Sequence, residues 1–240
     1  MALKEKFSIP SIIAAISFIY LAFTPIVIDP FSNLIMGNSL SGVINHLIDT
    51  IFEFRNILIF WSYIIIVVGI FTKFDKIAVA VSAALLCFNT LVSFIETIIS
   101  SIRYHFTIEF DTVVLALSYM LAYFLVFGIA LWLAILFFKK KETPKFLKIV
   151  AFAPVAVFAL ILFFSFFNNV SDMISLISAI GVNMKYLLNT LIIDSSETFN
   201  RAVMIIGFGA VMIKLTDLKK KPKNTVEISE NIVVENVTAE

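Results

Sequence analysis

The chain alternates between long apolar segments and short charged ones. Its longest uncharged segment, Thr112 to Phe138, has 27 residues and ends at the three lysines 139–141. At about 1.5 Å per residue, a helix of this length reaches roughly 40 Å, which exceeds a hydrocarbon core of about 30 Å. Clustered lysines are hard to translocate. The segment therefore predicts a transmembrane helix with its lysine end in the cytoplasm.

Shorter apolar segments predict further membrane spans on both sides of this helix. The predicted spans are residues 9–28, 57–72, 77–102, 112–138, 149–167 and 198–214. The last has the weakest pattern, because only Ala202 to Ile213 lies uncharged between Arg201 and Lys214. It spans only if both charged side chains extend toward their own interfaces. The expected fold is an all-α integral membrane protein, a bundle of about six transmembrane helices.

Residues 42–56 predict an amphipathic helix outside the bundle. Ile44 and Ile48 fall on one side of this helix, and Asn45 and Asp49 fall on the other. An apolar face opposite a polar one is typical of a helix that lies in the membrane interface.

Residues 170–193 also show helical periodicity, which is interrupted at 181–183. The pattern fits either two short amphipathic helices on the outer surface or a shallow re-entrant hairpin. Residues 1–216 then form a single polytopic membrane domain. The tail, residues 217–240, is basic and then acidic, as is typical of a disordered cytoplasmic segment.

Composition and charge support this topology. Hydrophobic residues make up 60% of the chain and the mean hydropathy is +1.02, which excludes an ordinary soluble domain. On the six-helix topology, 14 of the 18 lysines and arginines face the cytoplasm, whereas the acidic residues divide into nine outside and eight inside. This distribution satisfies the positive-inside rule and predicts a cell-membrane protein with both termini cytoplasmic. A net charge of +1 gives no indication of nucleic-acid binding.

Residues for catalysis or metal binding are scarce. Cys87, His46 and His105 are the whole set of cysteines and histidines, and they form no recognisable zinc, haem or iron–sulfur ligand pattern. The sequence also lacks the common hydrolase, metalloprotease and phosphate-loop motifs. We therefore expect no cofactor, no metal and no enzymatic activity.

A polar stripe follows one face of the predicted helix at 77–102. Its members are spaced by 4, 3, 4 and 3 residues and share an arc of roughly 80°: Asn89, Ser93, Glu96, Ser100 and Arg103. Ionisable side chains within a membrane usually face a bundle interior or a watery cavity, so the stripe is a candidate substrate or ion path. Alternatively, Asn and Ser hydrogen-bond between helices and Glu96 lies among the lipid headgroups.

The three arginines all fall on the predicted outer side. Because a guanidinium binds carboxylates and phosphates with two parallel hydrogen bonds, Arg55, Arg103 and Arg201 are candidate contacts for an outer anion or lipid headgroup. In the simpler alternative, each arginine pairs with an outer carboxylate of the chain. Those carboxylates include Glu53, Glu96, Glu109 and Glu197.

These patterns favour a permease, or the membrane subunit of a larger transporter, embedded in the lipid bilayer. Its site would lie between the helix at 77–102 and the short helices at 57–72 and 198–214. At 240 residues it would act as a homo-oligomer or beside other membrane subunits. The alternative is an accessory, immunity or assembly protein that binds membrane partners through its outer amphipathic segments. An intramembrane enzyme ranks third, because the sequence shows no convergent polar groups.

Overall fold

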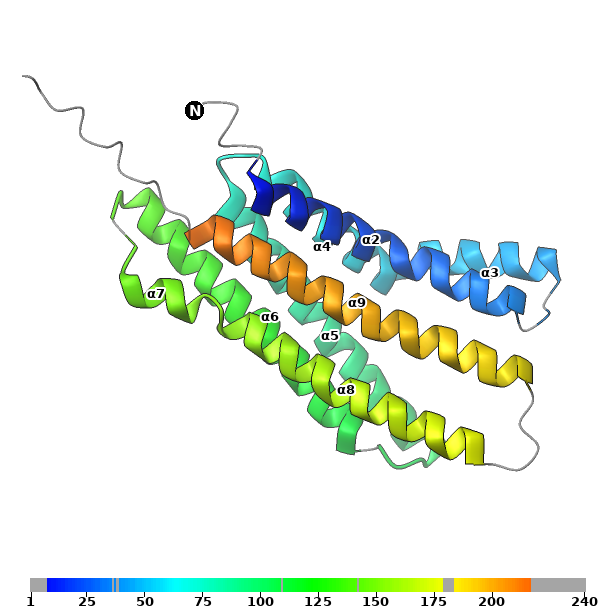
Figure 1. The fold of residues 1–240 in the computed structure, drawn as a ribbon. Helices are drawn as coiled ribbons and strands as arrows, with labels where there is room; N and C mark the ends of the chain where they lie inside the picture. Colours follow the sequence, from blue (N-terminus) through cyan, green and yellow to red (C-terminus); the bar gives the residue numbers. More distant parts are fainter. Residues whose placement is uncertain are drawn as a thin grey trace, which may run out of the picture.

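The computed structural model describes residues 8–216 except 36, 38, 109, 142 and 179–183, and the described part is helical with short connections and no strand. The predicted tail at 217–240 and the interruption at 181–183 lie outside the described residues. The helices are α2 (Ile9–Ile35), α3 (Leu40–Phe52), α4 (Phe54–Ile70), α5 (Asp75–Tyr104), α6 (Phe110–Phe138), α7 (Lys145–Val150), α8 (Ala153–Ser178) and α9 (Met184–Thr216) (Figure 1).

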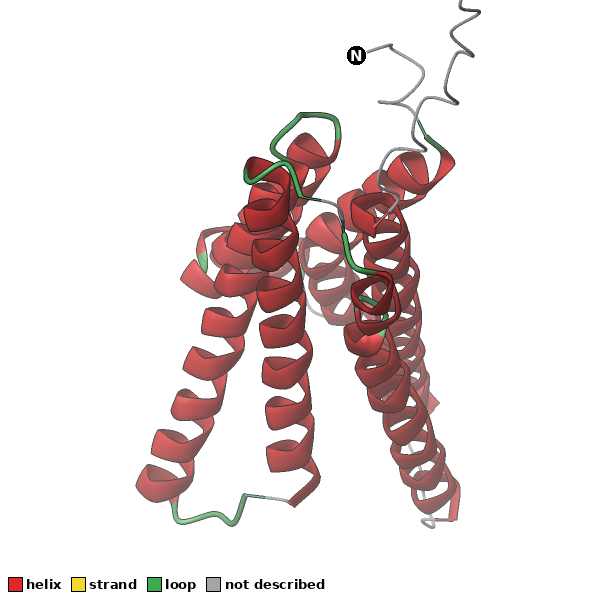
Figure 2. Cartoon of the chain, turned by 90° about the vertical axis from the view of Figure 1, so that its left-hand side faces the viewer, coloured by secondary structure: helices red, strands yellow, loops and turns green. Residues whose placement is uncertain are grey.

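Six of these helices form a closed ring. Around the ring, α2 packs on α4, α4 on α5, α5 on α6, α6 on α8, α8 on α9, and α9 on α2 again. In Figure 1, α2, α9 and α8 form the nearer layer, and α4, α5 and α6 form the farther one. Helices α6 and α9 also touch across the ring. Figure 2 shows the loop that joins α5 to α6 at one end of the bundle.

The two ends of the ring carry different cations. The Lys76 ammonium lies 4.9 Å from the centre of the Phe137 ring, and Lys214 lies 5.9 Å from that of Phe71. These contacts bring the start of α5, the last residues of α6 and the last residues of α9 together, and we call this the lysine end. Arg55, at the start of α4, and Arg103, in the last turn of α5, lie toward the opposite end, which we call the arginine end, whereas Arg201 lies near the middle of α9. That the lysine end faces the cytoplasm stays a prediction.

Several of the helices are long and apolar enough to cross a membrane, so the protein is membrane-embedded. Within the part of the chain that the structure describes, four qualify by length and composition: α5, α6, the segment Lys145–Ser175 and the segment Leu187–Thr216. Helices α3 and α4 together would make a fifth, bent by 62°. The described apolar part of α2, Ile9–Pro25, is shorter than a full span. The prediction of six spans is therefore not confirmed.

The bend between α3 and α4 falls at Glu53. The side-chain amide of Asn56 donates to the backbone carbonyl of Thr50 (2.9 Å) and to the Glu53 carboxylate (3.1 Å). One side chain on α4 thus satisfies a carbonyl at the end of α3, where the helix leaves its acceptors unpaired. The single helix expected over 42–56 is divided at this bend: α3, which packs on α2, ends at Phe52, and residues 54–56 belong to α4. The position of α3 at the membrane interface stays a prediction.

The described residues within 170–193 are the last residues of α8 and the first residues of α9. Just outside this stretch, the Asn169 amide lies 3.4 Å from the carbonyl of Asp194 and 3.3 Å from the hydroxyl of Thr198, so polar side chains connect the two helices there. That residues 170–193 lie on the outer surface or re-enter the membrane stays a prediction.

The predicted helix at 149–167 begins later than expected. Helix α7 ends at Val150, and α8 begins at Ala153, with Pro154 in its first turn. Proline has no backbone N–H and is tolerated there, whereas further along a helix it would remove a hydrogen bond.

Helices α4 and α5 are joined by a hydrogen bond in the bundle interior. The Ser82 hydroxyl donates to the backbone carbonyl of Ser62 at 2.6 Å, and both serines are fully buried. We expect Ser82→Ala to lower the free energy of unfolding by about 0.6 kcal/mol, as interhelical hydrogen bonds in membranes average. Unfolding of the purified protein in detergent measures the change. Ser195→Ala, at an exposed position on α9, is the matched control and should have no effect.

Candidate functional site

The polar stripe on α5 runs from the bundle interior to the rim of the arginine end. Asn89 is buried, and its carbonyl oxygen Oδ1 has no hydrogen-bond partner among the described residues. Ser93 and Ser100 are half-buried, whereas Glu96 and Arg103 are exposed. Buried polar atoms almost always have partners, so the orphaned oxygen of Asn89 is the most unusual feature of the stripe.

Glu96 connects the stripe to one of the arginines. Its carboxylate Oε2 lies 3.1 Å from Nη1 of Arg55, at the start of α4, and the two side chains are 52% and 40% exposed. An ion pair this exposed contributes little to stability. The ion pair thus joins the polar stripe to one of the three arginines. It agrees with the simpler alternative for Arg55, in which each arginine pairs with a carboxylate of the chain.

Arg201 lies in a different environment, with its side chain only 13% exposed. Its Nη2 donates to the Glu197 carboxylate at 2.9 Å, and its Nε donates to the hydroxyl of Tyr119 on α6 at 3.2 Å. Its remaining nitrogen, Nη1, is buried without a partner among the described residues. Arg55 and Arg201 therefore pair on different helices, and Arg103 is exposed at the end of α5. No described contact gathers the three arginines into one site.

The centre of the ring is filled by five aromatic side chains that we call the aromatic plug: Phe18, Tyr63, Tyr123, Phe158 and Phe208. All are buried, and they come from α2, α4, α6, α8 and α9. The Phe208 ring lies 5.0 Å from both Phe18 and Phe158 and 6.1 Å from Tyr123, measured between centroids. Phe18 stacks on Tyr63 at 5.5 Å. Five of the six ring helices therefore meet at one cluster.

One hydroxyl of the plug has a partner beside it: the Tyr123 hydroxyl lies 3.6 Å from the sulfur of Met204 on α9. Tyr119 stacks on Tyr123 at 6.1 Å and accepts the hydrogen bond from Arg201. The plug is thus capped by a guanidinium on the side of the arginine end.

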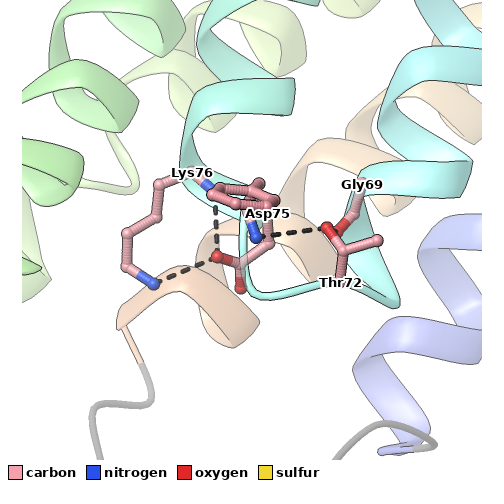
Figure 3. A network of polar contacts seen from close by, with 5 residues as sticks. Gly69, Thr72, Asp75 and Lys76 are labelled. Atoms are coloured by element: carbon pink, nitrogen blue, oxygen red, sulfur yellow. Dashed lines mark hydrogen bonds and ion pairs between the residues drawn. The ribbon is translucent and has the colours of Figure 1, made fainter.

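The lysine end has its own polar network, at the turn between α4 and α5 (Figure 3). The Thr72 hydroxyl donates to the carbonyl of Gly69 at 2.9 Å. The Asp75 carboxylate accepts from both the backbone N–H (2.8 Å) and the ammonium (3.2 Å) of Lys76. A carboxylate in the first turn also complements the helix dipole of α5. The network holds a nearly buried ion pair at the lysine end of the ring.

No family model, curated protein or solved structure matches this chain. Among the described residues, no three His, Cys, Asp or Glu side chains are grouped closely enough to hold a metal ion.

The sequence analysis missed the aromatic plug and Tyr119. Tyr119 and Tyr123 are spaced by four and so share a helix face, and a buried tyrosine needs a partner for its hydroxyl. That spacing was a usable signal on α6. The phenylalanines of the plug gave no such signal, because the chain has 26 phenylalanines and a phenylalanine in a membrane helix can face lipid as readily as the core.

Proposed function

We propose that this protein is a permease-type transporter, or the membrane subunit of one, whose path follows the axis of the helical ring. The observation that carries the proposal is the closed ring around the aromatic plug, with charged groups at both of its ends. A bundle that needed only to be stable in lipid would gain little from buried tyrosine hydroxyls and a nearly buried arginine. As a constriction on a path between two charged ends, the same groups have a use.

Asn89 also supports this proposal. It lies on α5, the one ring helix that adds no side chain to the plug. Its oxygen Oδ1 is an unused acceptor inside the bundle, on the α5 stripe that also carries Glu96, the ion-pair partner of Arg55. A purely structural asparagine would be expected to bond to a neighbouring helix with both ends of its amide. An acceptor left open inside a transporter is available to a passing solute.

The test is uptake into liposomes that contain the purified full chain, with radiolabelled pyruvate, alanine and rubidium as an anionic, a zwitterionic and a cationic probe. We expect protein-dependent uptake of at least one probe. Asn89→Leu should reduce this uptake about tenfold, as expected for the loss of one hydrogen bond worth roughly 1.5 kcal/mol. Glu96→Gln should reduce it less, because that carboxylate is exposed at the rim.

The stability of the Asn89→Leu variant separates a transport role from a structural one. Leucine replaces an amide whose oxygen is unsatisfied, so the free energy of unfolding should stay unchanged or rise. Unchanged uptake in this variant would remove the stripe from the path. If no probe enters and a second membrane protein co-purifies only when residues 170–193 are intact, the accessory or assembly function would replace this proposal.

A further inference from the structure

Arg201 is held in a fixed position with part of its binding capacity unused. Two of its three nitrogens are engaged, by Tyr119 and by Glu197, and the side chain is almost completely covered by the bundle. The third, Nη1, carries two N–H donors that meet no acceptor among the described residues. A guanidinium with open donors is suited to a carboxylate, which can accept two parallel hydrogen bonds.

The contact with Glu197 shows that Arg201 binds a carboxylate. Its carboxylate lies 2.9 Å from Nη2 of Arg201, four residues away on the same helix, but its own side chain is 53% exposed. Exposed ion pairs with this spacing are weak and are readily exchanged for other partners. An incoming carboxylate can therefore take the place of Glu197, while Arg201 keeps its bond to Tyr119.

The surroundings of Arg201 favour an apolar body on that carboxylate. The ring of Tyr119 lies 6.1 Å from Tyr123 and 6.3 Å from Phe158, so the aromatic plug begins directly beneath the guanidinium. One fixed cation next to a cluster of rings is the arrangement expected for a singly charged, partly apolar anion.

We propose that Arg201 and Tyr119 bind the carboxylate of a small apolar monocarboxylic acid, in competition with Glu197. The inference deepens the proposed function and rests on it for the meaning of the site, because it names the class of solute that would enter at the arginine end. Binding itself does not require transport and can be measured without it.

The experiment measures equilibrium binding of radiolabelled benzoate to the purified full chain in neutral detergent by scintillation proximity. We expect saturable binding that unlabelled benzoate displaces and neutral benzamide does not. Glu197→Gln should tighten binding about fivefold, because it removes the competing carboxylate. Arg201→Gln should weaken binding at least tenfold, and Arg201→Lys should weaken it less, since lysine keeps the charge but loses the planar fork.

Asp111→Asn is the matched control. It also removes one carboxylate at the arginine end, where Asp111 accepts a hydrogen bond from Asn168 at 3.2 Å, and it should leave benzoate affinity unchanged. The Glu197→Gln variant keeps the test valid even if Arg201→Gln fails to fold, because it alters an exposed side chain. Equal affinity in Glu197→Gln and the unaltered chain, or binding of soluble phosphatidylglycerol without binding of benzoate, would overturn the proposal.

The binding result and the uptake result are independent. Benzoate binding that depends on Arg201, without uptake of any probe, would support this site and contradict the permease function. Uptake that is insensitive to Arg201→Gln, without benzoate binding, would support the permease function and contradict this site.

Discussion

Replacing Gly69 with alanine should destabilise the protein by about 1–3 kcal/mol, the range typical of overpacking a filled interior. A Cβ atom at this position would lie 2.1 Å from the Cβ of Ala78, where the last turn of α4 meets the first turns of α5. Both atoms are fixed to helical backbones and cannot rotate away, so the two helices must separate. Thermal unfolding of the purified protein in detergent measures the loss.

Two further variants show whether this close approach is the cause. A Cβ at Gly128, on α6, would meet no atom within 4 Å, so Gly128→Ala should be neutral or stabilise the helix by up to about 1 kcal/mol. Combining Gly69→Ala with Ala78→Gly moves the methyl group across the contact and should recover most of the lost stability. If Gly69→Ala is as stable as Gly128→Ala, the close packing of α4 on α5 is not as the structure describes it.

The sequence predicted the helices that are governed by a single strong signal. Helix α6 contains the expected span at 112–138, because 27 uncharged residues leave few alternatives. Lys140, with a positive φ of 52°, follows the end of this helix. Helix α5 extends the expected span at 77–102 by a few residues at each end, to Asp75 and Tyr104. Length and hydrophobicity were sufficient to identify these helices.

The sequence did not predict the full lengths of α8 and α9, because charged residues were taken as a sign of exposed segments outside the membrane spans. Asp194, Glu197 and Arg201 interrupt the hydrophobic pattern of α9, but none of them interrupts its hydrogen-bonded backbone. A charged side chain that is paired four residues away or across to a neighbouring helix is compatible with a long helix. Such pairing depends on which helices are adjacent, and a single sequence does not contain that information.

The candidate site was also predictable only in part, because a single sequence does not show which helices are adjacent. The helical spacing predicts Asn89 and Glu96 on one face, and in the structure Asn89 is buried and Glu96 is exposed. The partners of these residues come from elsewhere in the chain: Arg55 is 41 residues from Glu96, and Tyr119 is 82 residues from Arg201. The packing of α4 on α5 brings the first pair together and the approach of α9 to α6 brings the second, and hydropathy does not encode which helices pack together.

Replacing Phe208 with alanine should open the aromatic plug and make liposomes that contain the protein leaky to pyruvate and rubidium. Its ring is fully buried and touches rings from α2, α6 and α8, so truncation leaves a void where the helices of the ring converge. Removing a buried phenylalanine ring typically lowers stability by about 3–5 kcal/mol. Uptake of both probes, together with thermal unfolding, measures the two effects on the same preparation.

The matched control is Phe124→Ala, one residue beyond Tyr123 on α6 and facing outward with 62% of its surface exposed. This change removes the same ring at a similar height in the bundle, but it should leave both uptake and stability nearly unchanged. Phe208→Leu, which keeps most of the volume, should fold well and leak less than Phe208→Ala. A Phe208→Ala protein that folds and stays as impermeable as the Phe124→Ala control would show that the plug does not close a path, and the proposed transport along the ring axis would then be wrong.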